Sequence, residues 1–304
     1  MTTTTATVLP RRRPERRRGR AGRYLFIAPY ALLLLVFGVL PTAYAIYISL
    51  TATAQVGAHS RGIANYLYAI GDYRFLSAFT HVALFLVIYL PVMAVLNVSL
   101  ALMLQARRGR FASAVKFIYY LPGAVSGAAS VLLWLFMLDP SVSPARPLLA
   151  ALGYRTLEQS VEPAHLPAAF AVILFATGAG TWIVTFYGAL NAIPDDLVEA
   201  ARIDGASAWQ LALRVKIPLI RKWIAYMIIL SFAGGSQLFV EPELVNTATQ
   251  GLVGPAWSPS QLSYVYAFQN NNFGGSAAIS VFLLIISLAA ALVVVFRTRL
   301  FSAG

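Results

Sequence analysis

Long apolar stretches alternate with short polar ones along the whole chain. Six of the apolar stretches reach about 20 residues, the length that an α-helix needs to cross a bilayer. Strands of a membrane barrel are about ten residues long and alternate in polarity, so the pattern favours helices. The sequence therefore predicts an all-α, polytopic membrane protein with six transmembrane helices. The predicted spans cover residues 24–50, 78–104, 116–138, 166–190, 222–242 and 276–296.

Composition supports this reading and excludes several kinds of site. Of the 304 residues, 59% are hydrophobic and 11% charged, whereas a soluble protein carries about 25% charged residues. The chain has no cysteine, which excludes disulfides and thiolate metal sites. Its three histidines are widely spaced and indicate no metal cluster: His59, His81 and His165. Motifs of the forms G-x-x-x-x-G-K-[ST], G-x-S-x-G and H-E-x-x-H do not occur, so we expect no catalytic residues and no cofactor bound by this chain.

Ionisable groups are nearly missing from the predicted spans. His81 stands near one end of the second span, and Glu241 at the outer end of the fifth. Proton-coupled or sodium-coupled carriers usually hold such groups at membrane depth. We therefore expect any uphill transport by this chain to draw its energy from another subunit.

The basic residues predict an orientation. Nineteen of the 23 lysines and arginines lie in the N-terminal segment, in 105–116, in 191–223 and at the C-terminus. Only four lie in the opposite loops. Because Lys and Arg concentrate on the cytoplasmic side, both termini and the 191–223 segment are predicted to be cytoplasmic, in a plasma membrane.

Residues 1–23 form a basic tail separate from the predicted membrane domain, 24–300. The tail contains RRRPERRRGRAGR, which we interpret as an orientation-setting segment that touches anionic lipid. A cleaved signal peptide is disfavoured because the following apolar stretch is too long and has no small-residue cleavage site. Nucleic-acid binding is disfavoured for a short tail tethered to a membrane.

A polar segment interrupts the apolar pattern at residues 191–220, which we call the island. It reads as two short helices with a break between them. Asp195 and Asp196 favour a helix start, and Gly205 permits a sharp turn. Ser207 and Gln210 have the spacing of a capping box, which would begin the second helix. Pro218 is expected to mark a bend before the fifth span. By pattern alone, a short amphipathic helix on the lipid surface is an equal alternative.

The island resembles the EAA loop of permease subunits of binding-protein-dependent ABC importers. That loop reads E-A-A, three residues, a glycine and, after nine more, I-x-L-P. The fit extends to the carbohydrate-importer branch, similar to maltose and glycerol-phosphate permeases, and covers roughly 24–300. Departures at Ala212, Lys216 and Lys222 leave the resemblance intact. Lys216→Thr is expected to be nearly silent, because threonine is common at this position of the loop. The matching coupling residues are Glu199, Ala200, Ala201, Asp204, Gly205, Ala206 and Pro218.

This resemblance implies a type I ABC importer permease fold with a mechanical role. The EAA loop would be a coupling helix seated in a cytoplasmic ATPase, with ATP and Mg bound by the partner subunits. The implied partners are a second permease in a heterodimer, two ATP-binding subunits, an extracytoplasmic solute-binding protein, membrane lipid and a carbohydrate.

The resemblance also implies a solute path between the helices that flank the island. Positions counted from Glu199, together with nearby polar or aromatic residues, give Gly178, Thr181, Trp182, Ser231, Gly234, Gly235, Gln237, Leu238 and Glu241. The alternative is helix packing, which small residues in membrane helices commonly mediate.

Two other functions stay open. One is an importer of a polyol, a glycerol phosphodiester or a peptide, although the spans offer a phosphate no basic residues. The other is a membrane glycosyltransferase, for which only Asp139, Glu241 and Glu243 are available, without a recognisable arrangement.

Overall fold

The computed structural model describes residues 18–52, 62–107, 109–125 and 127–298, and its regular structure within these ranges is helical, without strands. Most of the predicted basic tail lies outside the described residues. The chain divides into two compact units, Met1–Tyr47 and Ile48–Gly304. The predicted all-α fold is confirmed.

The described part of the first unit is one long helix. It comprises α1 (Arg18–Leu34), the π-helical turn η1 (Leu35–Val39) and most of α2 (Leu40–Thr51). Its apolar part, Phe26–Thr51, is long enough to cross a membrane. The Leu40 N–H donates to the Leu35 carbonyl just before Pro41. The predicted first span is therefore a single helix with a wide turn ahead of its second proline.

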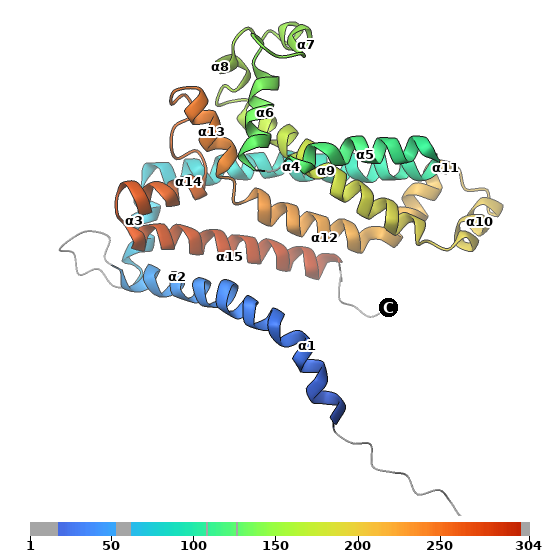
Figure 1. Ribbon diagram of the computed structural model, residues 1–304, viewed down its shortest axis with the longest axis horizontal. Coiled ribbons are helices and arrows are strands. Elements are labelled where there is room, and N and C mark those ends of the chain that lie inside the picture. Colours follow the sequence, from blue (N-terminus) through green and yellow to red (C-terminus); the bar gives the residue numbers. More distant parts are fainter. Residues whose placement is uncertain (1–17, 53–61, 108, 126, 299–304) are drawn as a thin grey trace, which may run out of the picture. The chain divides into compact units, whose positions relative to one another are not determined.

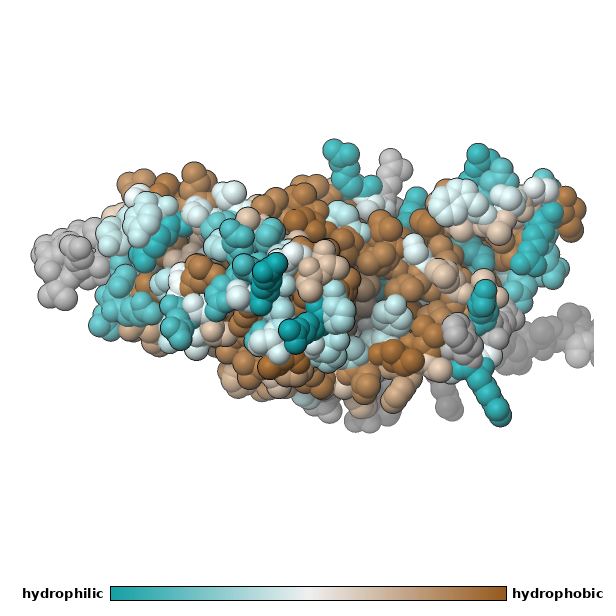
Figure 2. Space-filling view, turned by 90° about the horizontal axis from the view of Figure 1, so that it is seen from above, coloured by the Kyte–Doolittle hydropathy of each residue, from teal (hydrophilic) through white to brown (hydrophobic). Residues whose placement is uncertain are grey.

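Four long helices lie side by side in the second unit (Figure 1), and α4 packs against both α9 and α12. They are α4 (Tyr73–Ala106), α9 (Leu166–Asn191), α12 (Ile217–Gly235) and α15 (Phe273–Thr298). Large apolar side chains fill the core between them, including Phe85, Met93, Phe170, Phe186 and Met227. Figure 2 shows broad apolar areas on the face that it views, broken by polar side chains.

Shorter helices connect these long ones. They are α3 (Ala64–Gly71), α5 (Arg110–Ala124), α6 (Ala128–Leu138), α7 (Arg146–Ala151), α8 (Leu157–Ser160), α10 (Asp195–Ile203), α11 (Ala208–Gln210), η2 (Leu211–Lys216), α13 (Val240–Ala248), α14 (Pro259–Tyr264) and η3 (Val265–Gln269).

Two predicted spans need correction. Five helices in the described residues are long and apolar enough to cross a membrane, or six if α5 and α6 count as one span. The 116–138 stretch is not straight, because the pair Ala112–Ala124 and Ala128–Leu138 bends by 107°. Gly127, with a φ of 67°, supplies the left-handed backbone beside the bend. The fifth span runs over Ala208–Gly235 instead of 222–242, so Glu241 belongs to the separate helix α13.

Candidate functional site

The island folds as a helix, a glycine turn and a capped second helix. Asp195 and Asp196 stand in the first turn of α10, where carboxylates favour the positive end of the helix dipole. Gly205 adopts a φ of 80°, as predicted for the turn. Its N–H donates to the Arg202 carbonyl (3.0 Å), and the Ala206 N–H donates to the Ala201 carbonyl (3.0 Å). These bonds satisfy carbonyls that the end of α10 would otherwise leave unpaired.

The second helix begins at the predicted capping box. The Gln210 N–H donates to the Ser207 hydroxyl (3.3 Å), and the Ser207 N–H donates to the Gln210 side-chain oxygen (2.8 Å). A bend was predicted at Pro218; α11, η2 and α12 form one unbroken helix over Ala208–Gly235, so the helix continues through this proline. The π-helical turn η2 ends two residues before Pro218 and accommodates a residue that has no N–H.

A large polar cavity of about 1060 Å³ lies behind the island, against the end of α4. Its lining includes Gln105, Glu199, Arg202, Trp209 and Lys216. Glu199 and Ala200 are exposed, whereas Ala201 and Ala206 are half-buried. The island lies at the end of the bundle (Figure 1), and its exposed residues also include the large apolar Ile203 and Trp209.

A second polar cavity, of about 300 Å³, lies among the helices. Four elements contribute its polar side chains: α4, α6, α9 and α13, through Tyr89, Ser130, Thr177 and Glu241. The cavity borders two interrupted stretches of helix, the α5–α6 bend and the break between α12 and α13. Broken helices expose backbone and side-chain polar groups, so they commonly line solute sites in membrane transporters.

This cavity gathers only some of the predicted path residues. Gly178 and Glu241 line it, and the Ser231 hydroxyl lies within reach of the lining residue Tyr89. The remaining six stand outside its lining: Thr181, Trp182, Gly234, Gly235, Gln237 and Leu238. Of these, Gly235 and Leu238 have packing roles. A Cβ at position 235 would lie 2.9 Å from Leu86, and the Leu238 carbonyl accepts a bond from Ser258.

Sequence reasoning missed Tyr89, Ser130 and Thr177. Each lies in a mainly apolar helix, and nothing local distinguishes it from a residue used in packing. Tyr89 carried a weak signal, because it is the one tyrosine between residues 78 and 104.

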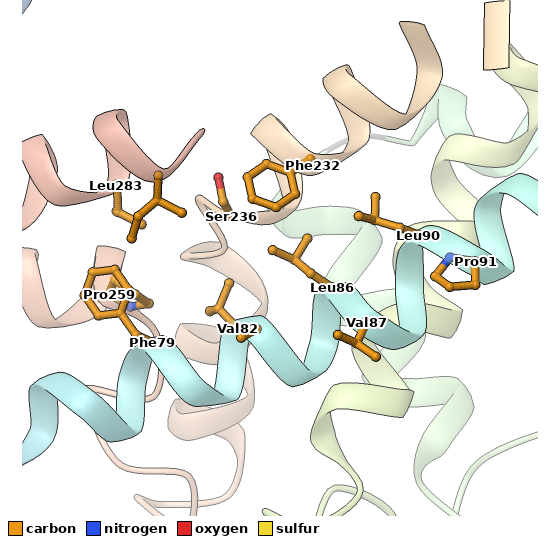
Figure 3. Close-up of a pocket in the computed structure, with 12 residues that line it drawn as sticks. Phe79, Val82, Leu86, Val87, Leu90, Pro91, Phe232, Ser236, Pro259 and Leu283 are labelled. Carbon is orange, nitrogen blue, oxygen red and sulfur yellow. The ribbon is translucent and has the colours of Figure 1, made fainter. Parts of the chain in front are cut away.

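Figure 3 shows an apolar cavity of about 650 Å³ between α4, α12, α14 and α15. Ser236 is the single polar residue of its lining, and its hydroxyl already bonds to the Ala233 carbonyl and to Ser287. A carbohydrate would find almost no hydrogen-bonding group here. This cavity is therefore no part of the polar site.

A bundle of membrane-spanning helices, with a structured loop at one end and a polar cavity inside, defines a transport permease. The chain matches, over residues 73–302, the family described as "Binding-protein-dependent transport system inner membrane component". It belongs to this family and is a multi-pass permease subunit of an ABC importer.

The sequence similarity to known permeases extends over most of this chain and of theirs. The "Osmoprotective compounds uptake permease protein GgtC" of Synechocystis sp. is 27% identical, over 86% of this chain and 93% of its own. The "sn-glycerol-3-phosphate transport system permease protein UgpA" of Rhizobium meliloti is 30% identical, over 86% and 89%. The fold matches a solved bacterial alginate ABC transporter in complex with an alginate pentasaccharide-bound periplasmic protein. That match has a TM-score of 0.77 at 19% identity and covers 94% of this chain and 97% of the other.

Proposed function

We propose that this chain is one of two permease subunits of an ATP-driven importer that carries a neutral carbohydrate across the plasma membrane. The observation that carries the proposal is the combination, in one bundle, of a capped island at one end and a polar cavity among the helices. An importer needs both parts, since the first receives force and the second passes solute.

The island would couple the bundle to two ATP-binding subunits, which hold ATP and Mg. Glu199 is exposed on α10 and can anchor a partner, while the exposed Ala200 and Ala208 permit close approach. Gly205 and the Ser207 cap hold the two island helices at a fixed turn. A rigid island transmits displacement better than a flexible loop does.

The solute would pass through the cavity lined by Tyr89, Ser130, Thr177 and Glu241. Hydroxyls and a carboxylate can pair with sugar hydroxyls, and the tyrosine adds an aromatic face. No Lys or Arg occurs in this lining, which disfavours a phosphate-bearing solute. The similar permeases include one for sn-glycerol-3-phosphate, a polyol phosphate, and the similar structure is a transporter of alginate, a polysaccharide. A polyol importer is therefore the second candidate.

An extracytoplasmic solute-binding protein and a second permease would complete the assembly. The solved alginate transporter is in complex with a periplasmic protein that holds the pentasaccharide, which supports this expectation. The lysine and arginine bias supports cytoplasmic termini and a cytoplasmic island.

A membrane glycosyltransferase finds little support in the geometry. The carboxylate of Asp139 accepts bonds from Ser141, and that of Glu243 accepts a bond from Gln261 (2.8 Å). Both acids therefore serve local structure, and Glu241 lines the polar cavity without them.

Reconstitution tests the proposal. The complete complex in liposomes should take up its sugar only with ATP on the island side and binding protein on the other side. Glu199→Lys should reduce retention of the ATP-binding subunits and uptake by about tenfold or more, with membrane insertion unchanged. ATP-independent uptake by the purified chain would overturn the proposal.

A further inference from the structure

A single side chain joins both ends of the island to a third helix. Gln105 lies in the last turn of α4, half-buried, next to the cavity behind the island. Its side-chain N–H donates to the carbonyl of Leu190 (2.7 Å), one residue before the island begins. Its side-chain oxygen accepts a bond from the Lys216 ammonium (2.7 Å), near the island's far end. We call Gln105 and Lys216 the clasp.

The two partners of Gln105 are well placed for strong bonds. Leu190 lies in the last turn of α9, where helix carbonyls lack a partner within the helix. The Ile193 N–H donates to the Leu190 carbonyl over a long distance, 3.4 Å, so this bond is weak. The bond from Lys216 involves a charged donor, and such bonds are about twice as strong as neutral ones.

The π-helical turn positions Lys216. Lys216 is the last residue of η2, and the following N–H, of Ile217, donates to the Ala212 carbonyl five residues back. A π turn inserts one extra residue relative to an α-helix, so it rotates the side chains beyond it by about 100°. The turn thus sets the direction in which Lys216 leaves the helix.

The amide of Gln105 suits both of its partners. It can accept a bond from an ammonium and donate one to a carbonyl at the same time. A glutamate could keep only the bond from Lys216, and a leucine of similar size could keep neither.

We propose that the clasp transmits the movement of the island to α4, so that Gln105 and Lys216 are positioning residues of the coupling step. The inference rests on the proposed function. Covalently, the island pulls only on α9 and α12, which enter and leave it. The clasp adds a direct polar link from the island to α4, which also packs against α9 and α12. Helix α4 carries Tyr89 in the polar cavity, 16 residues and about 24 Å along the helix from Gln105.

The clasp reverses one expectation from sequence. A threonine at position 216 cannot reach Gln105, so Lys216→Thr should disturb coupling where the family resemblance predicted near silence. Arg214 provides a matched control, because it is exposed and two residues away on the same turn. Arg214→Met also removes one positive charge, and it leaves the clasp intact.

The first measurement is geometric and does not depend on function. Because the chain has no cysteine, spin labels can be placed at Met103→Cys on α4 and Ile203→Cys on α10, both exposed. In the assembled complex, the wild-type background should give one narrow distance distribution. Gln105→Leu and Lys216→Thr should broaden it, whereas Lys216→Arg and Arg214→Met should not. Unchanged distributions in both clasp variants would overturn the proposal.

The second measurement reads coupling. A cysteine at Ser130, in the polar cavity, is labelled with a thiol reagent with and without ATP and vanadate. In the wild-type background the labelling rate should change severalfold. Gln105→Leu and Lys216→Thr should lose this change while ATP turnover stays within about twofold, and Lys216→Arg should restore it. If the labelling rate in Lys216→Thr still changes with ATP and vanadate, the proposed role of the clasp is wrong.

The two failures are distinguishable. If Gln105→Leu does not assemble, Lys216→Thr decides, because it removes the ammonium from the clasp and leaves Gln105 in place. If the wild-type complex shows no nucleotide response at all, the proposed function fails, whatever the clasp variants do.

Discussion

Gly205 is the residue on which the shape of the island depends most directly. Its φ of 80° is strained for most residues, and its N–H bonds to the Arg202 carbonyl. Gly205→Pro cannot adopt this φ and has no N–H, so we expect uptake and stimulated ATP turnover to fall by more than tenfold. Gly205→Asn is the control, because asparagine tolerates left-handed backbone, and it should keep most activity. Equal activity of both variants would mean that the turn has no role in coupling.

Asp72, outside the spans, predicts a pH dependence of stability. Its carboxylate accepts bonds from Arg74 and from the Tyr266 hydroxyl (2.8 Å), and so joins α4 to η3. The bonds from Arg74 lower the pKa of Asp72 from 3.8 to about 2. A lowered pKa stabilises the fold above about pH 4, and the gain is lost as the pH falls from 4 towards 2.

We therefore expect Asp72→Asn to lower the melting temperature at pH 7. The difference from the wild type should shrink as the pH falls from 4 towards 2, where the Asp72 carboxylate becomes protonated and both side chains are neutral. Thermal unfolding in detergent across this range measures it. A difference that stays constant with pH would show that the carboxylate charge contributes nothing.

At the scale of elements, Pro41 and Pro218 each lie inside a long helix without interrupting it. A bend was predicted at Pro218, and both helices continue through their prolines. In each case a π turn ends two residues before the proline, and the residue between them donates its N–H five residues back. The wide turn removes the clash that a proline makes with the preceding turn of an α-helix. Local sequence marks such a proline, but the choice between a bend and a π turn depends on the packing around it.

The cavity shows why a path is harder to predict than a loop. The island's turn and cap follow from residues that are neighbours in sequence, and the structure confirms them at Gly205 and Ser207. The cavity combines α4, α6, α9 and α13, and its walls depend on how broken helices meet. Counting from the EAA loop found Gly178 because it lies on α9, the helix that leads directly into the island. The same count could not find Tyr89 or Ser130, which lie on other elements.

Two threonines on α9 allow the predicted path to be tested against the observed cavity. Thr177 lines the cavity, whereas Thr181, one turn further on, is exposed outside its lining. Thr177→Val removes a hydroxyl from the cavity with little change of shape, so uptake should fall about fivefold to tenfold, close to 1 kcal/mol. Thr181→Val should be nearly silent. Uptake in liposomes with equal amounts of assembled complex measures both; the reverse order of effects would return the path to the positions counted from the island.

At the scale of the whole molecule, the basic residues and the helices make one joint prediction about topology. Nineteen of 23 lysines and arginines belong to segments predicted on one side. The island and the end of α4 share one end of the bundle, held by the Gln105 bonds.

Ile203 and Pro255 are both exposed and lie in loops assigned to opposite sides. In a chain without cysteines, an impermeant thiol reagent added to intact cells should label Pro255→Cys and leave Ile203→Cys unmodified. Inverted membrane vesicles should give the opposite result, with a permeant reagent labelling both. Labelling of Ile203→Cys from outside would place the island beyond the reach of a cytoplasmic ATPase, and the coupling function would fall with it.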